Sequence, residues 1–205
     1  AKITSFIFIL QHVNKEIFSY DERIEQFISF YRDSFSKHWN DEKFKWEAIK
    51  VFQDNWDLNA KDFKSMFDKA TSATSSLLTS YNHYSRSMIL NFCDIDSKAV
   101  QNMFAVLYDE HKDIKERLSF FKSESERIKN VHNASIAGKV APDDKGWGMT
   151  YQDENAISTY LWLRYPDKYY IYKYGEVIKV EKFLSDSPVI KKGEGEANFL
   201  ATIGL

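Results

Sequence analysis

The fold class depends on one stretch of the sequence, 158-STYLWLRYPDKYYIYKY-174. Its two halves are rich in aromatic and β-branched residues, and each half is short for a helix. Pro166-Asp167 between them is a turn signal, because proline presets φ at the first central position of a type I turn. We therefore expect two short strands, 158–165 and 169–174, paired as a β-hairpin, and a short helix over 176–184.

An isolated hairpin is only marginally stable in water, so these strands need a partner. Either they lie on helices, or they take a third strand, for which the apolar run Ile3–Leu10 is our candidate. That run is too short to cross a bilayer, which needs about 20 apolar residues. No basic segment precedes it, so we expect neither a signal peptide nor a membrane as partner.

Residues 14–132 carry a helical pattern. Apolar side chains recur every three or four residues through 14–36, which indicates one long amphipathic helix. Trp39-Asn40-Asp41 interrupts the pattern and predicts a break before the next helix. The helix starts that we expect further along are marked by capping residues, which are Asn59 with Asp62, Asp96, and Asp109 or Asp113. Because each apolar stripe must be buried against another, these segments predict a helical bundle.

The composition changes after this bundle. Fourteen of the sixteen Phe residues precede residue 122, whereas seven of the twelve Tyr residues follow residue 150. We therefore expect an α+β fold that is mainly α. Its expected parts are a bundle over 1–135, a loop over 136–149, a small α+β element packed on the bundle over 150–186, and a linker over 187–205.

Composition also limits the function. The 205 residues include 43% hydrophobic and 28% charged residues, which is ordinary for a globular chain and excludes general disorder. The net charge of −2 excludes a uniformly basic nucleic-acid coat. The single cysteine, Cys93, cannot form an intramolecular disulfide, so we expect a reducing compartment, the cytoplasm.

The sequence contains no recognised catalytic or cofactor motif. It lacks the glycine-rich loop of nucleotide-binding proteins, and its five histidines have no zinc-ligand spacing. The pairs Asp94/Asp96 and Asp153/Glu154 would suit acid–base chemistry, but helix capping explains them as well. We expect no enzyme activity, no cofactor and no metal site.

The candidate binding site is the aromatic segment 147–174, in which nine of 28 residues are Trp or Tyr, with cations between them. Rings and cations on one strand face would suit stacking on nucleic-acid bases. The residues assigned to this surface are Trp147, Tyr160, Trp162, Arg164, Lys168, Tyr170, Tyr172 and Lys173. Residues 139–182 hold seven basic and seven acidic side chains, so the local charge is not basic, and packing of the rings in a core stays open.

Three strings resemble a known family. They are KWEAIKVFQDNWDLNAKDFKSMF (45–67), SRSMILNF (85–92) and YQDENAISTYLWLRYPDKYYIYKYG (151–175). They are similar to the N-terminal region of McrB-type AAA+ NTPases, the motor subunits of modification-dependent restriction systems. The resemblance covers roughly residues 20–185, and no motor motif lies within the sequence.

This resemblance implies a function. In that family a variable N-terminal module reads DNA or a modified base, a C-terminal motor hydrolyses nucleotide, and a separate nuclease subunit cuts. We therefore expect a non-catalytic DNA-recognition module of a defence system, with its own motor and a nuclease as partners. The alternative is a protein-interaction or regulatory module without nucleic-acid contact, whose rings are core or protein hot spots. A free-standing enzyme is the third reading.

Overall fold

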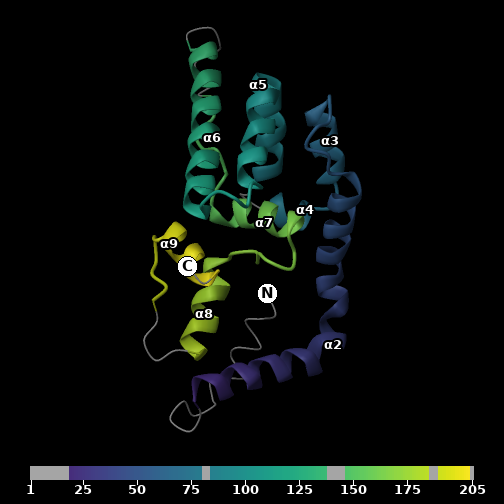
Figure 1. Cartoon of the computed structure of the whole chain (residues 1–205), viewed down its shortest axis with the longest axis vertical. Helices are drawn as coiled ribbons and strands as arrows, with labels where there is room; N and C mark the ends of the chain where they lie inside the picture. The colour runs from purple at the N-terminus through teal and green to yellow at the C-terminus, as the bar shows by residue number, and fades with distance from the viewer. Residues whose placement is uncertain (1–18, 80–83, 138–145, 185–188, 204–205) are drawn as a thin grey trace. The chain divides into compact units, whose positions relative to one another are not determined.

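The computed structural model describes residues 19–79, 84–137, 146–184 and 189–203, and these contain helices and no strand (Figure 1). The helices are α2 (Tyr20–Asn55), α3 (Phe63–Ala70), α4 (Ser75–Leu78), α5 (Ser85–Leu107), α6 (Ile114–Ile136), α7 (Glu154–Arg164), α8 (Tyr174–Leu184) and α9 (Gly195–Thr202). The chain divides into two compact units, one of residues Phe44–Tyr170 and one of Ala1–Lys43 with Ile171–Leu205. We call them the central unit and the terminal unit.

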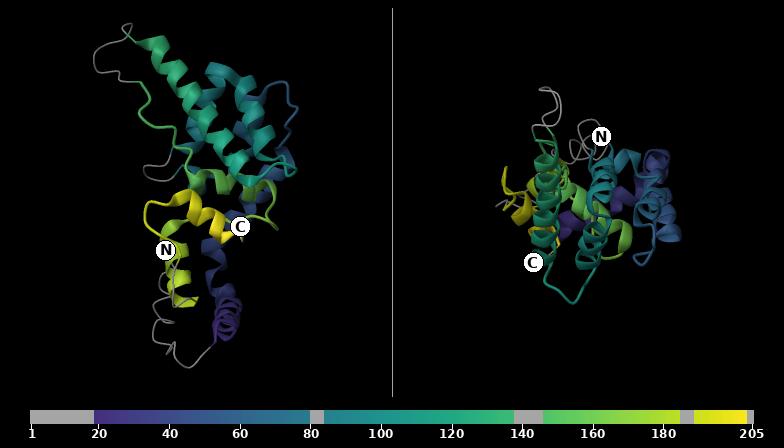
Figure 2. Two further views of the ribbon diagram at one scale, coloured as in Figure 1. Left: turned by 60° about the vertical axis from the view of Figure 1, so that its left-hand side comes forward. Right: turned by 90° about the horizontal axis from the view of Figure 1, so that it is seen from above.

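Helices α5 and α6 lie side by side and form the frame of the central unit (Figures 1 and 2). The short connection between them makes them antiparallel neighbours. Asp113 ends that connection, and its carboxylate accepts hydrogen bonds from the backbone N–H groups of Lys115 and Glu116 at 2.8 and 3.4 Å. This N-cap confirms one of the two predicted starts of α6. Helix α7 lies across the ends of α5 and α6 that this connection joins.

The core of the central unit is aromatic, and Phe104 of α5 is at its centre. Its ring, fully buried, meets the rings of Phe121 and Tyr160 edge to face at 5.2 Å each. Four more rings lie within ring-contact distance of Phe104, those of Trp56, Phe63, Phe67 and Tyr108. Edge-to-face pairs of this kind stabilise a core beyond the area that they bury. Phe63, Phe67, Phe104 and Phe121 thus form one cluster with Trp56, Tyr108 and Tyr160.

The predicted β-hairpin is wrong, and with it the α+β class: residues 154–164 form helix α7. Asp153 is its N-cap, with its carboxylate accepting the N–H of Ala156 at 2.9 Å. The run 156–161, more than one full turn, is buried without interruption, including Thr159, whose hydroxyl donates to the carbonyl of Asn155 at 2.7 Å. A helix that is buried on all sides shows no amphipathic period, so its apolar run imitates a strand.

The second predicted strand, 169–174, has no regular structure before α8 begins at Tyr174. The turn at Pro166-Asp167 is confirmed, because the N–H groups of Lys168 and Tyr169 both donate to the carbonyl of Tyr165 at 3.0 Å. The predicted helix over 176–184 is also confirmed by α8. Pro166 therefore ends a helix here instead of joining two strands.

Two helix boundaries differ from expectation in an instructive way. Helix α2 continues through Trp39-Asn40-Asp41, so the predicted break is wrong. Helix α5, by contrast, is kinked at Asp96, which has non-helical φ and ψ of −155° and 79°. The Asp96 carboxylate accepts the N–H of Ala99 at 2.9 Å, so it caps the second half of α5 as predicted. Of the predicted capping pair Asn59 and Asp62, only Asp62 caps α3, and its carboxylate accepts the N–H of Ser65 at 3.0 Å.

The terminal unit contains α8, α9 and the first part of α2. Phe183 is buried among partly buried apolar side chains, which are Phe27, Phe30, Val180 and Leu184. Helix α9 lies within the segment expected to be a linker, and the ring of Phe199 contacts that of Tyr172 at 6.0 Å. The candidate strand Ile3–Leu10 lies outside the described residues. None of the described helices combines the length and the apolar character that crossing a bilayer requires.

Candidate functional site

The structure buries two of the predicted aromatic residues, so the eight do not form one exposed surface. Six of them belong to the central unit, whereas Tyr172 and Lys173 belong to the terminal unit. Tyr160 is fully buried and Tyr172 is 6% exposed, so neither ring can stack on a base. The hydroxyl of Tyr160 donates to the side-chain oxygen of Gln152 at 3.1 Å, and burial raises the pKa of this phenol. These two rings are core.

The other predicted residues have varied surroundings. Trp147 is half-buried, and its ring stacks on His132 at 3.7 Å between centroids. Lys168 forms an ion pair with Glu110, and this hydrogen bond raises the pKa of Lys168. Trp162 of α7 is half-buried. The exposed members of the predicted set are Arg164, Lys168, Tyr170, which is 67% exposed, and Lys173.

Arg164 lines a cavity of about 420 Å³ in the central unit. The residues around it come from the end of α2, the end of α5 and the end of α7, and they are Trp56, Asp57, Leu58, Asn59, Ala105, Tyr108, Asp109, Arg164 and Tyr165. We call this space the Arg164 cavity. Its size falls within the usual range of small-ligand pockets, about 300–1,000 Å³.

The aromatic side of the Arg164 cavity is fixed by packing. Trp56 is half-buried, with its ring stacked on that of Phe52 at 4.7 Å. The hydroxyl of Tyr165 donates to the carbonyl of Tyr108 at 2.9 Å, which holds the Tyr165 ring in place. Burial raises the pKa of Tyr108 well above its ordinary value. The rings of Trp56 and Tyr165 therefore line the cavity in fixed orientations, together with the buried phenol of Tyr108.

Charges of both signs line the Arg164 cavity. The Arg164 guanidinium lies over the Tyr165 ring at 5.2 Å from the centroid, and within the described part of the chain it forms no ion pair. Asp57 and Asp109 form local turns, accepting the N–H groups of Asn59 at 2.9 Å and His111 at 3.1 Å respectively. The cavity thus offers one cation, two carboxylates and flat apolar surfaces.

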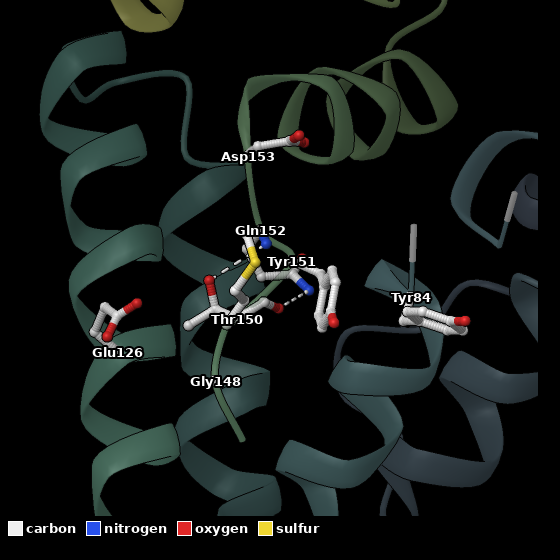
Figure 3. A pocket seen from close by; sticks show the side chains of 8 residues that line it. Tyr84, Glu126, Gly148, Thr150, Tyr151, Gln152 and Asp153 are labelled. Carbon is white, nitrogen blue, oxygen red and sulfur yellow. Dashed lines mark hydrogen bonds between the residues drawn. The ribbon is translucent and has the colours of Figure 1, made fainter. Parts of the chain in front are cut away.

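A second cavity, of about 620 Å³, lies between α5, α6 and the segment that leads into α7 (Figure 3). Its lining residues are Tyr84, Glu126, Gly148, Met149, Thr150, Tyr151, Gln152 and Asp153. A neighbouring cavity of about 300 Å³ shares four of them, which are Tyr84, Gly148, Met149 and Tyr151. We call the pair the Tyr84–Tyr151 cavity, after the two tyrosine rings, which meet edge to face at 5.4 Å.

No protein-family model, curated protein or solved structure matches this chain.

Three residues considered for chemistry, Cys93, Asp94 and Asp153, have structural surroundings. The only cysteine, Cys93, is buried, and burial raises the pKa of its thiol to about 12, so it is not an activated nucleophile. Among the described residues, no group of three or more His, Cys, Asp or Glu is placed to hold a metal ion. Asp94 and Asp153, both considered for acid–base roles, are an ion-pair partner of Lys64 and the N-cap of α7.

Sequence reasoning missed Trp56, Asp57 and Asp109 as lining residues of a shared cavity. Trp56 was expected only to end a helix, and Asp109 only to begin one. Tyr151 lies within the aromatic segment 147–174 but was not among the residues assigned to the surface, and Tyr84 carried no signal of a binding role. Two residues of the predicted set line a cavity. Arg164 lines the Arg164 cavity, and Trp147 lines the smaller part of the Tyr84–Tyr151 cavity.

Proposed function

We propose that this chain is a non-catalytic recognition module of an McrB-type restriction motor, acts in the cytoplasm, and binds an unpaired or extruded DNA base in the Arg164 cavity. The observation that carries the proposal is the Arg164 guanidinium, held over the Tyr165 ring beside Trp56 without a carboxylate partner. Proteins that read single bases combine aromatic stacking with polar contacts to the base edge.

The mixed charge of the cavity favours a base over a phosphate. A phosphate would meet Asp57 and Asp109 as well as Arg164, and their carboxylates would repel it. The exocyclic amino group of cytosine, adenine or guanine donates hydrogen bonds, which suits a carboxylate acceptor. A guanidinium suits the ring and carbonyl acceptors of the same base. The lining therefore matches the edge of a base that carries an amino group, with Trp56 or Tyr165 as stacking partner.

The module role rests on the resemblance and on the chemistry of the cavities. The resemblance places nucleotide hydrolysis in a C-terminal motor and DNA cleavage in a separate nuclease subunit. The Arg164 cavity contains no side chain with the properties of an activated nucleophile, and we propose that it needs no cofactor. A binding cavity without reactive groups fits a subunit that selects a target for other subunits to act on.

The test is a fluorescence-anisotropy titration of the chain with labelled oligonucleotides. Single-stranded and duplex DNA, each with unmodified and with methylated cytosine, are compared at two salt concentrations. Replacing Arg164 by Ala should weaken binding by about 1–3 kcal/mol, since one base-contacting arginine contributes this much. The salt dependence should change little, because the proposed contact is to a base.

Two controls locate the effect. Lys98→Ala removes an exposed cation from α5 outside the cavity lining and should leave binding unchanged. Trp162→Ala tests the half-buried ring that the sequence had assigned to the site. Absence of binding by the wild-type chain at low salt would refute the proposal, and so would equal effects of Arg164→Ala and Lys98→Ala. Either result would favour the alternative, a protein-interaction module without nucleic-acid contact.

A further inference from the structure

The Tyr84–Tyr151 cavity is the second feature of the central unit that has the form of a binding site. Two of its apolar side chains are unusually open to solvent, because Tyr84 is 50% exposed and Met149 is 62% exposed. Tyr and Met are enriched where proteins bind other proteins, because Tyr offers a large rigid ring and Met an adaptable apolar chain. Exposed side chains of this kind, gathered at one cavity, differ from the isolated apolar residues common on any surface.

The segment that carries Met149 and Tyr151 is fastened at both ends. At one end, Asn133 of α6 bonds twice to the backbone of Trp147, accepting its N–H at 2.8 Å and donating to its carbonyl at 3.0 Å. At the other end, the side-chain amide of Gln152 donates to the carbonyl of Ser85 at 3.0 Å. The exposed side chains between these anchors are therefore held in place before any ligand arrives.

Tyr151 has a backbone conformation that tyrosine rarely adopts, with φ of +56°. The structure maintains it through the Ser85 hydroxyl, which donates to the Tyr151 carbonyl at 2.7 Å. In this conformation the Tyr151 ring meets that of Tyr84, as Figure 3 shows. A strained residue that is held by its surroundings and is only half-buried is typical of binding sites.

The charged side chains that line the Tyr84–Tyr151 cavity are acidic and favour a cationic ligand. Glu126 and Asp153 contribute carboxylates, and neither of the two neighbouring lining sets of described residues contains Lys or Arg. Glu126 pairs with Lys129 at 2.6 Å, but its own side chain is 52% exposed, and pairs of this kind contribute little to stability. Asp153 caps α7 and is otherwise exposed. Phenol rings beside carboxylates attract a cation.

We propose that the Tyr84–Tyr151 cavity binds a partner protein through a segment that presents a lysine or arginine side chain next to apolar residues. The cation binds at one of the lining carboxylates, which lie apart in Figure 3, and the apolar neighbours contact the tyrosine rings and Met149. This site is separate from the Arg164 cavity, and the two share no lining residue. The inference therefore does not depend on DNA binding.

The experiment uses short fluorescent peptides that are identical except at a central residue, which is lysine, arginine, norleucine or glutamate between leucines. Binding to the whole chain is measured by anisotropy. The chain is also labelled with ¹³C at the methionine methyl groups, of which it has four. The lysine and arginine peptides should bind about tenfold more tightly than the norleucine peptide. They should also shift the methyl resonance of Met149 and leave that of Met103, which is fully buried, in place.

Two substitutions remove the charges without removing the fold. Glu126→Gln changes an exposed side chain, and Asp153→Asn keeps an N-cap of equal quality. Together they should reduce the preference for the lysine peptide over the norleucine peptide to about twofold or less. Glu116→Gln, an exposed glutamate of the same helix outside the lining, should change nothing.

Several results would overturn this proposal. They are equal binding of the lysine and norleucine peptides, tighter binding of the glutamate peptide, no binding of any peptide, binding without a shift of Met149, and an unchanged preference in the double variant. Arg164→Ala should affect oligonucleotides and not peptides, so failure of one proposal can be told apart from failure of the other.

Discussion

Of the described glycines, Gly146 has the least space for a side chain. It lies at the start of the described segment that leads to α7. Its φ is +69°, and a Cβ added there would lie 2.5 Å from Oδ1 of Asn133, the atom that accepts the N–H of Trp147. Gly146→Ala should therefore lower the free energy of unfolding by about 1–3 kcal/mol, as strained backbone positions do. Chemical denaturation followed by circular dichroism measures the change.

Gly148→Ala is the matched control for this prediction. No atom lies within 4 Å of the added Cβ at Gly148, so its effect should stay within about 0.5 kcal/mol, as at ordinary surface positions. Equal stabilities of the two variants would show that the double hydrogen bond of Asn133 does not depend on a glycine at position 146.

Glu110 makes a contribution to stability that depends on pH. The hydrogen bond from Lys168 lowers the pKa of the Glu110 carboxyl, and Tyr169 donates to the same oxygen at 3.4 Å. Because the pKa is lower in the folded state, this contribution is present above the ordinary glutamate pKa and is lost as the pH falls through the lowered value. Glu110→Gln should thus destabilise the chain at neutral pH and progressively less in acid.

Urea denaturation of wild type and Glu110→Gln at a series of pH values measures this dependence. The stability difference should shrink as the pH falls below the ordinary range of a glutamate. A difference that stays constant from neutral to acid pH would mean that the carboxylate charge is not what stabilises the fold here.

At the scale of single elements, the stability of helix α6 depends on its N-cap, Asp113. Asp113→Ala removes the acceptor for two backbone N–H groups at its start and should cost about 1 kcal/mol. Asp113→Asn keeps an equally good capping side chain and should cost far less. Thermal unfolding of the two variants measures the difference, and equal melting temperatures would contradict the role of this cap.

The helices that the sequence predicts best are those with a cap and an apolar face. Asp62, Asp96 and Asp113 all act as caps where the pattern placed them. Helix α7 was missed because burial on every side removes the periodicity by which a helix is recognised. Its cap, Asp153, was visible in the sequence as one of several acidic pairs. The break predicted at Trp39 is wrong, because α2 continues through it. No side chain between residues 24 and 47 is buried, so burial does not explain why the helix continues there.

At the scale of the whole molecule, the stability of the central unit depends on the aromatic cluster around Phe104. Phe104→Ala would leave a hole among six other rings and should cost about 3–5 kcal/mol. Tyr170→Ala removes a ring that is 67% exposed and should be nearly neutral. Urea denaturation compares them, and a small effect of Phe104→Ala would place the main core elsewhere.

The candidate sites were less predictable than the helices, because each cavity collects residues from distant segments. Trp56, Tyr108 and Arg164 come from three helix ends that no local pattern connects. The aromatic segment 147–174 was predicted to bind a ligand because of its composition. In the structure, Tyr160 is buried in the core and Tyr170 is exposed. Only the three-dimensional arrangement decides which rings remain available to a ligand.

The burial of α7 affects the order in which parts of the central unit unfold. Ala156 to Leu161 of α7 are almost fully covered, so we expect solvent to reach this turn only when the core around it opens. In heavy water, the amide protons of Ile157 to Leu161, which are almost fully covered, should be among the slowest of the chain to be replaced by deuterium. The segment that looked like a peripheral hairpin is then the last part of this unit to come apart.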